Sequence, residues 1–320
     1  MILFIDEYPK SFLKKAITFC KIFVKEGFVQ GDWQEVFKNR KVGGSVSMPE
    51  IVKWHLPNFI GISKMNVLDI NGVNQIFVFK DVLALEWALK QKKKNPKLKI
   101  IAGPFIVNHP SERKFILENS GIDALVYFSQ WHQDMFKFFS KKIQLKKNYN
   151  WFCGVDEDYW QNDKIKIKDK VLIYSKTNPE VSEAIKRKLE NQGFEYLEIV
   201  CGEYTPDQYK LALSSAKLAI FVSVTETQGL AIFEAWSCNV PTLHFDPGVW
   251  SYQGIEYKKA SSCPYLEPKL GRRFSGVSDF DCEFKSVLDN IEEFTPREIV
   301  LKNYTIAHSM KKLSQILSSD

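Results

Sequence analysis

Short runs of apolar residues alternate along this chain with longer segments in which apolar residues recur every three or four positions. The runs have the length of buried strands, and the longer segments have the spacing of helices that bury one face. In the first half the pattern predicts strands over 2–5, 76–79, 98–105 and 124–128, with helices over 11–25, 82–92 and 111–119. In the second half it predicts strands over 170–176, 196–201, 218–222 and 243–245, with helices over 180–191, 205–214 and from 295 to near Leu317.

Strands that alternate with helices at this spacing predict an α/β protein with parallel sheets. A length of 320 residues favours two domains. Residues 28–72 show no clear pattern, and Gly43-Gly44 within them predicts a loop or a simple turn. Ligands of parallel sheets bind at the C-terminal ends of the strands, so polar residues that follow a strand are the candidates for a site.

The most informative segment is residues 221–243, which read as a strand, a polar loop ending in Gly229, a helix and a second strand after Asn239-Val-Pro241. Glu226 precedes the helix and Glu234 lies on it, about 7.5 Å along the axis from Gly229. The free N–H groups of a first helical turn suit a phosphate, and the carboxylates on either side suit hydroxyl groups. A ligand with sugar, diphosphate and ribose in a row fits this layout. The alternative is an ordinary strand–helix–strand unit, because acids are favoured at helix starts in any protein.

This segment resembles the E-x7-E motif of retaining GT-B glycosyltransferases, most closely the family 4-like group that includes bacterial lipopolysaccharide and mannosyl transferases. The positions that agree with the family pattern are Ser223, Glu226, Gly229, Glu234, Ala235 and Pro241. Thr227 and Gln228 replace the usual Gly-Phe, and Asn239 replaces a Gly before Val-Pro. Asn tolerates the left-handed conformation that a helix C-terminus needs.

The resemblance implies two Rossmann-like domains whose parallel sheets face each other across a cleft. We expect an acceptor-side domain over residues 1–152, a nucleotide-sugar domain over 153–296, and a C-terminal helix over 297–320 that returns to the first domain. The segment from Trp151 to Trp160, with Gly154-Val155-Asp156 inside it, resembles the passage between the two domains.

The resemblance also implies roles for individual residues. Glu226 would hold the donor sugar and Glu234 the ribose, and the diphosphate would lie on Lys176 and the segment Thr227, Gln228, Gly229 and Leu230. His109, which follows the strand over 98–105, would assist the leaving phosphate as a second catalytic residue, unless it is a loop histidine without a chemical role.

Two further assignments have alternatives. Tyr204 would stack on the base or cap the next helix. A second basic residue for the diphosphate would be Lys186 or Arg187, which are otherwise surface charges.

The implied activity is transfer of a sugar, with retention of anomeric configuration, from a nucleotide-diphosphate sugar to a glycan or glycolipid in surface polysaccharide synthesis. No cofactor and no metal is expected. Two alternatives remain open: a catalytically degenerate GT-B subunit that binds a partner or a glycan, and a GT-B nucleotide-sugar epimerase.

Composition and charge restrict the partners. No apolar run approaches 18 residues, the six cysteines form no C-x2-C pair, and the start lacks a signal-peptide shape, which together predict a cytoplasmic protein with reduced thiols. Residues 1–150 carry 24 basic and 13 acidic side chains. This excess indicates either solvated helix ends or peripheral contact with an anionic membrane at its inner face. No nucleic-acid-binding module is recognisable.

Overall fold

The computed structural model describes residues 2–5, 48, 59–61, 70, 72–162 and 168–319. The predicted helix over 11–25 and the Gly43-Gly44 turn lie outside these residues. The described residues up to Ala124, Met48 excepted, belong to one compact unit, and those from Leu125 onward belong to a second. The domain boundaries expected at residues 152 and 296 stay predictions.

The first unit is built on four parallel strands in the order β2-β1-β3-β4. Their bounds are β1 (Ile2–Ile5), β2 (Phe59–Gly61), β3 (Gln75–Lys80) and β4 (Lys99–Phe105). Helix α4 (Val82–Lys94) connects β3 to β4, and the side chain of Asp81 caps it by accepting the N–H of Leu83 at 2.8 Å. Lys92, Lys93 and Lys94 lie in the last turn of α4, where positive charge complements the helix dipole.

The helix expected over 111–119 is wrong in detail. Residues Arg113, Lys114 and Phe115 have φ between 52 and 57°, outside the right-handed helical region. The segment therefore consists of the short α5 (Glu112–Phe115) and the 3₁₀ turn η1 (Ile116–Glu118). The expected strands over 2–5, 76–79 and 98–105 and the helix over 82–92 are confirmed within two residues at each end.

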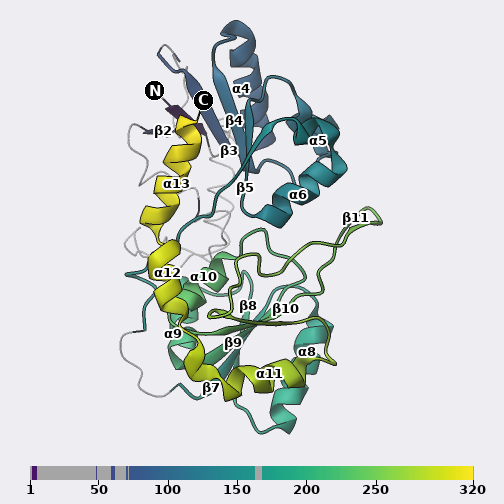
Figure 1. The fold of residues 1–320 in the computed structure, drawn as a ribbon, viewed down its shortest axis with the longest axis vertical. Coiled ribbons are helices and arrows are strands. Elements are labelled where there is room, and N and C mark those ends of the chain that lie inside the picture. Colours follow the sequence, from purple (N-terminus) through teal and green to yellow (C-terminus); the bar gives the residue numbers. More distant parts are fainter. Residues whose placement is uncertain are drawn as a thin grey trace, which may run out of the picture. The chain divides into compact units, whose positions relative to one another are not determined.

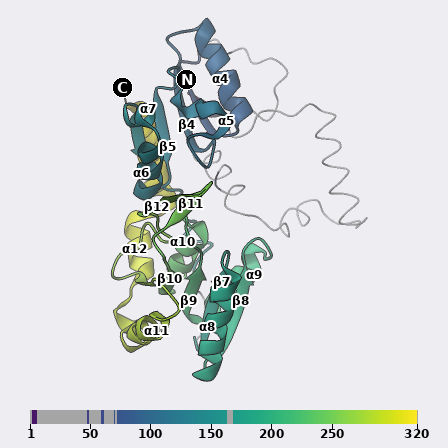
Figure 2. The same cartoon turned by 90° about the vertical axis from the view of Figure 1, so that its right-hand side faces the viewer.

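The second unit begins with β5 (Ala124–Tyr127), α6 (Gln130–Phe139), α7 (Lys141–Gln144) and β6 (Lys147–Asn150). Its main sheet has five parallel strands in the order β13-β10-β9-β7-β8. These are β7 (Lys170–Ser175), β8 (Tyr196–Val200), β9 (Ala216–Val222), β10 (Thr242–Phe245) and β13 (Gly271–Phe274). Figure 1 labels β7, β8, β9 and β10 of this sheet. The helices between them are α8 (Pro179–Asn191), α9 (Pro206–Ser215), α10 (Leu230–Ser237) and α11 (Phe280–Asp289), seen also in Figure 2.

Both faces of the central strands of this sheet are buried, and alternate apolar residues of β7 and of β9 belong to different cores. On β7, Leu172 and Tyr174 pack in the core that contains α9 and α10, while Val171 and Ile173 pack in the core that contains α8 and α11. Side chains of a strand point to opposite faces in turn, so a strand covered on both sides needs an unbroken apolar run. This explains why the runs in the sequence predicted β7 and β9 correctly.

A small antiparallel hairpin of β11 (Trp250–Tyr252) and β12 (Ile255–Tyr257) follows β10. Its two turn residues, Gln253 and Gly254, have φ of 49 and 81°, as a two-residue hairpin turn requires. The sequence analysis did not find this hairpin.

The single C-terminal helix expected from residue 295 is two helices, α12 (Pro296–Asn303) and α13 (Ile306–Ser318). Between them Thr305 forms an isolated parallel bridge with Val155 and caps α13 by accepting the N–H of His308 at 3.3 Å. The start of α13 is tied to the segment after β6, because the indole N–H of Trp151 donates to the Ser309 carbonyl at 3.0 Å. The return of this helix to the first domain stays a prediction.

The described cysteines are Cys153, Cys201, Cys238, Cys263 and Cys282, and all five have free thiols. The first, third and fourth are buried, whereas Cys282 is exposed on α11. No helix within the described ranges is long and apolar enough to cross a membrane.

The backbone atoms around residue 154 explain why this position is a glycine. A Cβ atom placed there would lie 2.4 Å from the Thr305 carbonyl oxygen and 2.6 Å from Ile306 Cα, both backbone atoms. We expect Gly154→Ala to lower the free energy of unfolding by about 1–3 kcal/mol, because the bridge to Thr305 must separate. Urea denaturation measures this change. Gly276→Ala is the control, since its Cβ would meet nothing closer than Ser278 Oγ at 3.5 Å, and an equal loss in both variants would contradict the explanation.

Candidate functional site

The site is built on the loop between β9 and α10. The strand ends at Val222, the loop runs to Gln228, and Gly229 is the N-cap of α10 with φ of 85°. Glycine is required there for two reasons: other residues rarely adopt this φ, and a Cβ would lie 2.6 Å from Ile232 Cδ1.

The start of α10 presents unpaired backbone donors. The first bonds of the helix run from the N–H groups of Ile232 and Phe233 to the Gly229 carbonyl. Among the described residues, no acceptor takes the N–H groups of residues 227–231. Together with the helix dipole these amides favour an anion.

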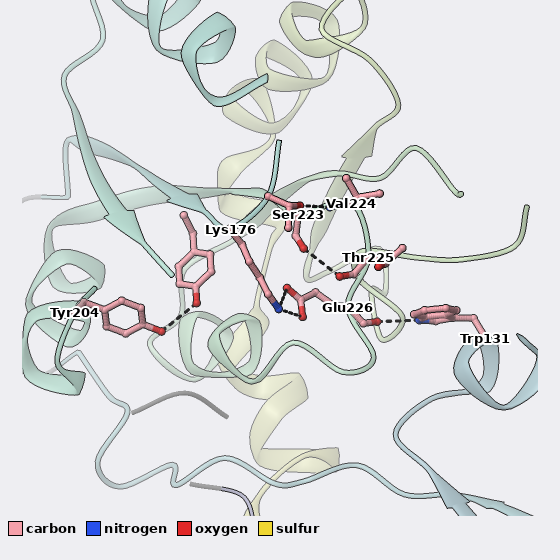
Figure 3. Close-up of polar contacts among 9 residues, drawn as sticks. Trp131, Lys176, Tyr204, Ser223, Val224, Thr225 and Glu226 are labelled. Carbon is pink, nitrogen blue, oxygen red and sulfur yellow. Dashed lines mark hydrogen bonds and ion pairs between the residues drawn. The ribbon is translucent and has the colours of Figure 1, made fainter. Parts of the chain in front are cut away.

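Every polar group of Glu226 has a partner, and Figure 3 shows its contacts with Lys176 and Trp131. Lys176 Nζ lies 2.8 Å from its Oε1 and 2.7 Å from its Oε2. The Glu226 N–H donates to the Ser261 carbonyl at 2.9 Å, and its carbonyl accepts the indole N–H of Trp131 at 2.9 Å. The carboxylate is 12% exposed, so the ion pair is partly shielded from water.

The loops after β7 and β9 are joined to each other. The N–H groups of Lys176 and Thr177 donate to the Val222 carbonyl at 3.1 and 3.2 Å, and Thr177 Oγ1 accepts the N–H of Val224 at 2.9 Å. Within the second loop, Ser223 Oγ donates to the Thr225 carbonyl at 3.1 Å. Since β7 and β9 are adjacent parallel strands, their C-terminal ends bring Lys176 and Glu226 to the same edge of the sheet.

Glu234 differs from Glu226 because its carboxylate has no hydrogen bond or ion pair within the described part of the chain. It is half-buried on α10, and burial raises its pKa to about 8. Burial, and after it the charge of Glu234, raises the pKa of Cys153 and of Tyr204, which places both side chains in its surroundings. An uncompensated acid in a half-buried position is the feature that a ligand hydroxyl pair would satisfy.

Gln228 turns its side chain away from solvent. Its Oε1 accepts the N–H of Cys153 at 2.7 Å and its Nε2 donates to the Cys153 carbonyl at 2.6 Å. Both residues are almost fully buried. The amide therefore joins the loop to the segment after β6, and only its backbone is available to a ligand. Thr227 and Leu230, beside it, are half-buried.

Tyr204 is half-buried in a group of tyrosines. Its hydroxyl lies 3.1 Å from that of Tyr174, and its ring packs against Tyr209 with the centroids 5.2 Å apart. The alternative role as the cap of α9 is wrong, because Thr205 is the N-cap and forms a capping box with Gln208.

The candidates for a second basic residue are on α8. Lys186 Nζ lies 2.7 Å from carboxylate oxygens of both Glu183 and Glu198, so its charge is already balanced there. Arg187 is exposed on the same helix. Of the basic residues considered for the diphosphate, Lys176 is the one that follows the end of β7.

Two residues that the sequence analysis missed support the loop. Asp246, directly after β10, accepts the Ser261 hydroxyl and the Ser262 N–H at 2.9 Å and pairs with Arg273 Nε at 3.0 Å. This arrangement holds the Ser261 carbonyl that binds the N–H of Glu226. Its position after a strand was a usable signal for Asp246, whereas Trp131 lies 95 positions from its partner and gave no local signal.

His109 belongs to the first unit and follows β4. Its Nδ1 accepts the N–H of Ser111 at 3.2 Å and lies 2.7 Å from the Ser111 hydroxyl. Burial lowers its pKa, partly offset by the nearby charge of Glu112. With Nδ1 as acceptor, the neutral ring carries its proton on Nε2.

No three His, Cys, Asp or Glu side chains of the described ranges come together as metal ligands. The acidic run Asp156-Glu157-Asp158 has a structural role. Asp156 Oδ1 accepts the N–H groups of Asp158 and Tyr159 at 3.2 and 3.0 Å, and so closes a turn.

The sequence was compared with family models and with curated proteins, and neither comparison gave a match. Solved structures do match in fold. The lipopolysaccharide outer core galactosyltransferase WaaB aligns over 99% of both chains with 10% identity and a TM-score of 0.57. This chain has the fold of the GT-B glycosyltransferases.

Two other matches share this fold. Sucrose-phosphate synthase of Thermosynechococcus elongatus aligns with 77% of this chain and 73% of its own, at 12% identity and a TM-score of 0.51. A TarM variant of S. aureus, solved with UDP and alpha-GlcNAc-glycerol among its ligands, aligns with 77% of this chain at 15% identity and a TM-score of 0.50. This chain spans only 55% of TarM. The resemblance drawn from the E-x7-E segment is thus confirmed at the level of fold.

The raised pKa of Glu234 makes stability depend on pH. Below pH 4.5, its ordinary value, the carboxyl is protonated in both the folded and the unfolded chain. As pH rises towards about 8 the unfolded chain ionises while the folded one resists, so the free energy of unfolding falls. We expect Glu234→Gln to raise the unfolding temperature by roughly 3 °C or more at pH 8.5 and by much less at pH 5. Glu180→Gln, an exposed acid on α8, should change neither, and equal shifts at both pH values would contradict the interpretation.

The pair of bonds between Gln228 and Cys153 gives a second pH-dependent expectation. In Gln228→Glu an ionised carboxylate accepts the Cys153 N–H but offers no donor to the Cys153 carbonyl. We expect a loss of about 3 kcal/mol in the free energy of unfolding at pH 8, since the carbonyl and the charge are both buried. Protonation at pH 5 restores a donor and reduces the loss. Urea denaturation at the two pH values measures it, with the exposed Gln253→Glu as control, and a pH-independent loss would argue against the bonded pair.

Proposed function

We propose that this chain is a retaining glycosyltransferase, which moves a sugar from a nucleotide-diphosphate sugar to a glycan or glycolipid. The observation that carries the proposal is Glu234. Its carboxylate is half-buried and has no partner in the described structure, and the first N–H groups of its helix are unpaired there as well. Leaving the carboxylate and the N–H groups without partners costs free energy, and a ligand that binds both would remove that cost. Ribose hydroxyls on Glu234 and a diphosphate on the amides satisfy both groups with one molecule.

Lys176 fits this arrangement without leaving Glu226. A lysine ammonium has three donors, and two of them reach the oxygens of Glu226. The third is available to a phosphate oxygen. Lys176 would then link the diphosphate to the acid that we assign to the donor sugar.

The chemistry assigned to the protein is positioning and electrostatic stabilisation. No protein nucleophile is invoked: the sugar leaves and the acceptor attacks on the same face, and the leaving phosphate takes the acceptor's proton. The amides of Thr227, Gln228, Gly229 and Leu230 would stabilise the charge that develops on this phosphate. His109, with its proton on Nε2, is assigned as a further donor to the phosphate by family resemblance.

The comparisons support a sugar nucleotide as the ligand class. TarM is described with UDP, and WaaB is named a galactosyltransferase of the lipopolysaccharide outer core. By analogy we place the reaction in surface polysaccharide synthesis. The cytoplasmic location, the contact of the basic first half with an anionic membrane, and a base stacked on Tyr204 are further parts of this proposal that rest on the sequence alone.

Nucleotide binding tests the proposal directly. We expect UDP, GDP or ADP, one of them selectively, to raise the unfolding temperature by roughly 5 °C when present at 100 times its dissociation constant. Glu234→Gln should weaken that binding at least tenfold, because the ribose loses its acceptor. Glu226→Gln should not weaken it, since Lys176 is then fully available to phosphate, but should lower turnover at least a hundredfold.

Glu180→Gln on α8 is the matched control and should bind and turn over as the wild type does. If no nucleotide shifts the unfolding temperature of the wild type, the transferase proposal fails and the degenerate-subunit alternative takes its place. Normal turnover in both Glu226→Gln and Glu234→Gln would instead show that the site is elsewhere.

A further inference from the structure

Trp131 makes a contact that none of the roles above explains. It lies at the start of α6, is 8% exposed, and donates its indole N–H to the Glu226 carbonyl at 2.9 Å (Figure 3). An indole has one donor and no acceptor, so this is the only conventional hydrogen bond that the ring can make. This large buried aromatic residue thus makes its one hydrogen bond to a backbone oxygen of Glu226, the acid that we assign to the donor sugar.

The backbone N–H of Glu226 is fixed as well as its carbonyl. The Glu226 N–H donates to the Ser261 carbonyl at 2.9 Å, and Asp246 holds the Ser261 hydroxyl at 2.9 Å. With Lys176 on the carboxylate, the backbone and the side chain of Glu226 have three independent supports. Of these only Trp131 acts on the carbonyl side, which is the side that continues into residues 227–231.

The planarity of the peptide unit gives this contact a consequence for the next residue. In a trans peptide the C=O and the following N–H point in opposite directions. With the Glu226 carbonyl directed at Trp131, the N–H of Thr227 is directed away from it. This N–H is the first of the series over residues 227–231 that has no acceptor in the described structure. Trp131 therefore sets the direction of a donor as well as the position of an acid.

We propose that Trp131 is a positioning residue for the sugar-transfer step, acting through the Glu226–Thr227 peptide. It touches no substrate: it holds the Glu226 carboxylate against the donor sugar and the Thr227 N–H against the leaving phosphate. The inference rests on the proposed function. It separates two tasks of the loop, because ribose and most of the diphosphate would be held by Glu234 and the later amides, with which Trp131 makes no hydrogen bond.

The experiment compares two tryptophans that make the same kind of bond. Trp131→Phe keeps an aromatic ring and removes the donor to Glu226. Trp151→Phe removes an equivalent bond, from a fully buried indole to the Ser309 carbonyl at 3.0 Å, outside the proposed site. We expect Trp131→Phe to lower kcat about 10- to 100-fold, because small displacements of reacting groups have effects of this size. Its KM for the donor and its Kd for the nucleotide should stay within about twofold.

Trp151→Phe should lower the unfolding temperature at least as much and leave kcat within about twofold of the wild type, which separates positioning from loss of stability. If Trp131→Phe does not fold, site-specific replacement of Trp131 by benzothienylalanine removes the N–H while the shape of the ring stays the same, and the same loss of kcat is expected.

Three results would overturn the inference. If the wild type transfers sugar and Trp131→Phe or the benzothienyl variant matches its kcat, Trp131 has no role in the step and the proposed function stands. If KM for the donor rises while kcat stays constant, Trp131 supports binding and not transfer. If the wild type binds no nucleotide and transfers no sugar, the proposed function fails first, and the role of Trp131 with it.

Discussion

Strands β7 and β9 have no face towards water, and this constraint decides where polar chemistry can occur in the second unit. The side chains of Val171 to Tyr174 on β7 and of Leu218 to Val222 on β9 lie in one of two apolar cores, so charged groups are found only towards or beyond the ends of these strands. Lys176 and Glu226 follow the C-terminal ends of the two neighbours, and the shared Val222 carbonyl joins the backbones that carry them. The ion pair is therefore a consequence of the sheet, and the direction of the Thr227 amide follows from how Glu226 is held.

The two acids of the E-x7-E segment are in opposite situations. Glu226 has a partner for every polar group, whereas Glu234 has a raised pKa and no partner in the described structure. The chain could have lowered this energy with a basic neighbour or a neutral side chain. A destabilised acid on α10 is what the proposed role in ligand binding would require, because a ligand that pairs with it would recover the lost stability as affinity.

Much of this arrangement could be predicted from the sequence, for identifiable reasons. Strands buried on both faces leave unbroken apolar runs, so β3, β4, β7 and β9 were found, and Asn239 does have the left-handed φ expected of it. The break between α12 and α13 was missed because it depends on the bridge from Thr305 to Val155, 150 residues away in the chain. Trp131 and the buried amide of Gln228 were missed for the same reason, since both act across long separations. Lys176 was found, but its pairing with Glu226 became visible only in three dimensions.

The bonds between Gln228 and Cys153 bear on how this loop can change over evolutionary time. Related transferases have Gly-Phe where this chain has Thr227-Gln228, and a designer would be inclined to restore that consensus. Here the substitution would leave the buried N–H and the buried carbonyl of Cys153 without the hydrogen bonds that the Gln228 amide makes to them. Residue 228 and the path of the chain through residue 153 are therefore coupled, and a return to the family sequence at residue 228 would be destabilising unless residue 153 found other partners.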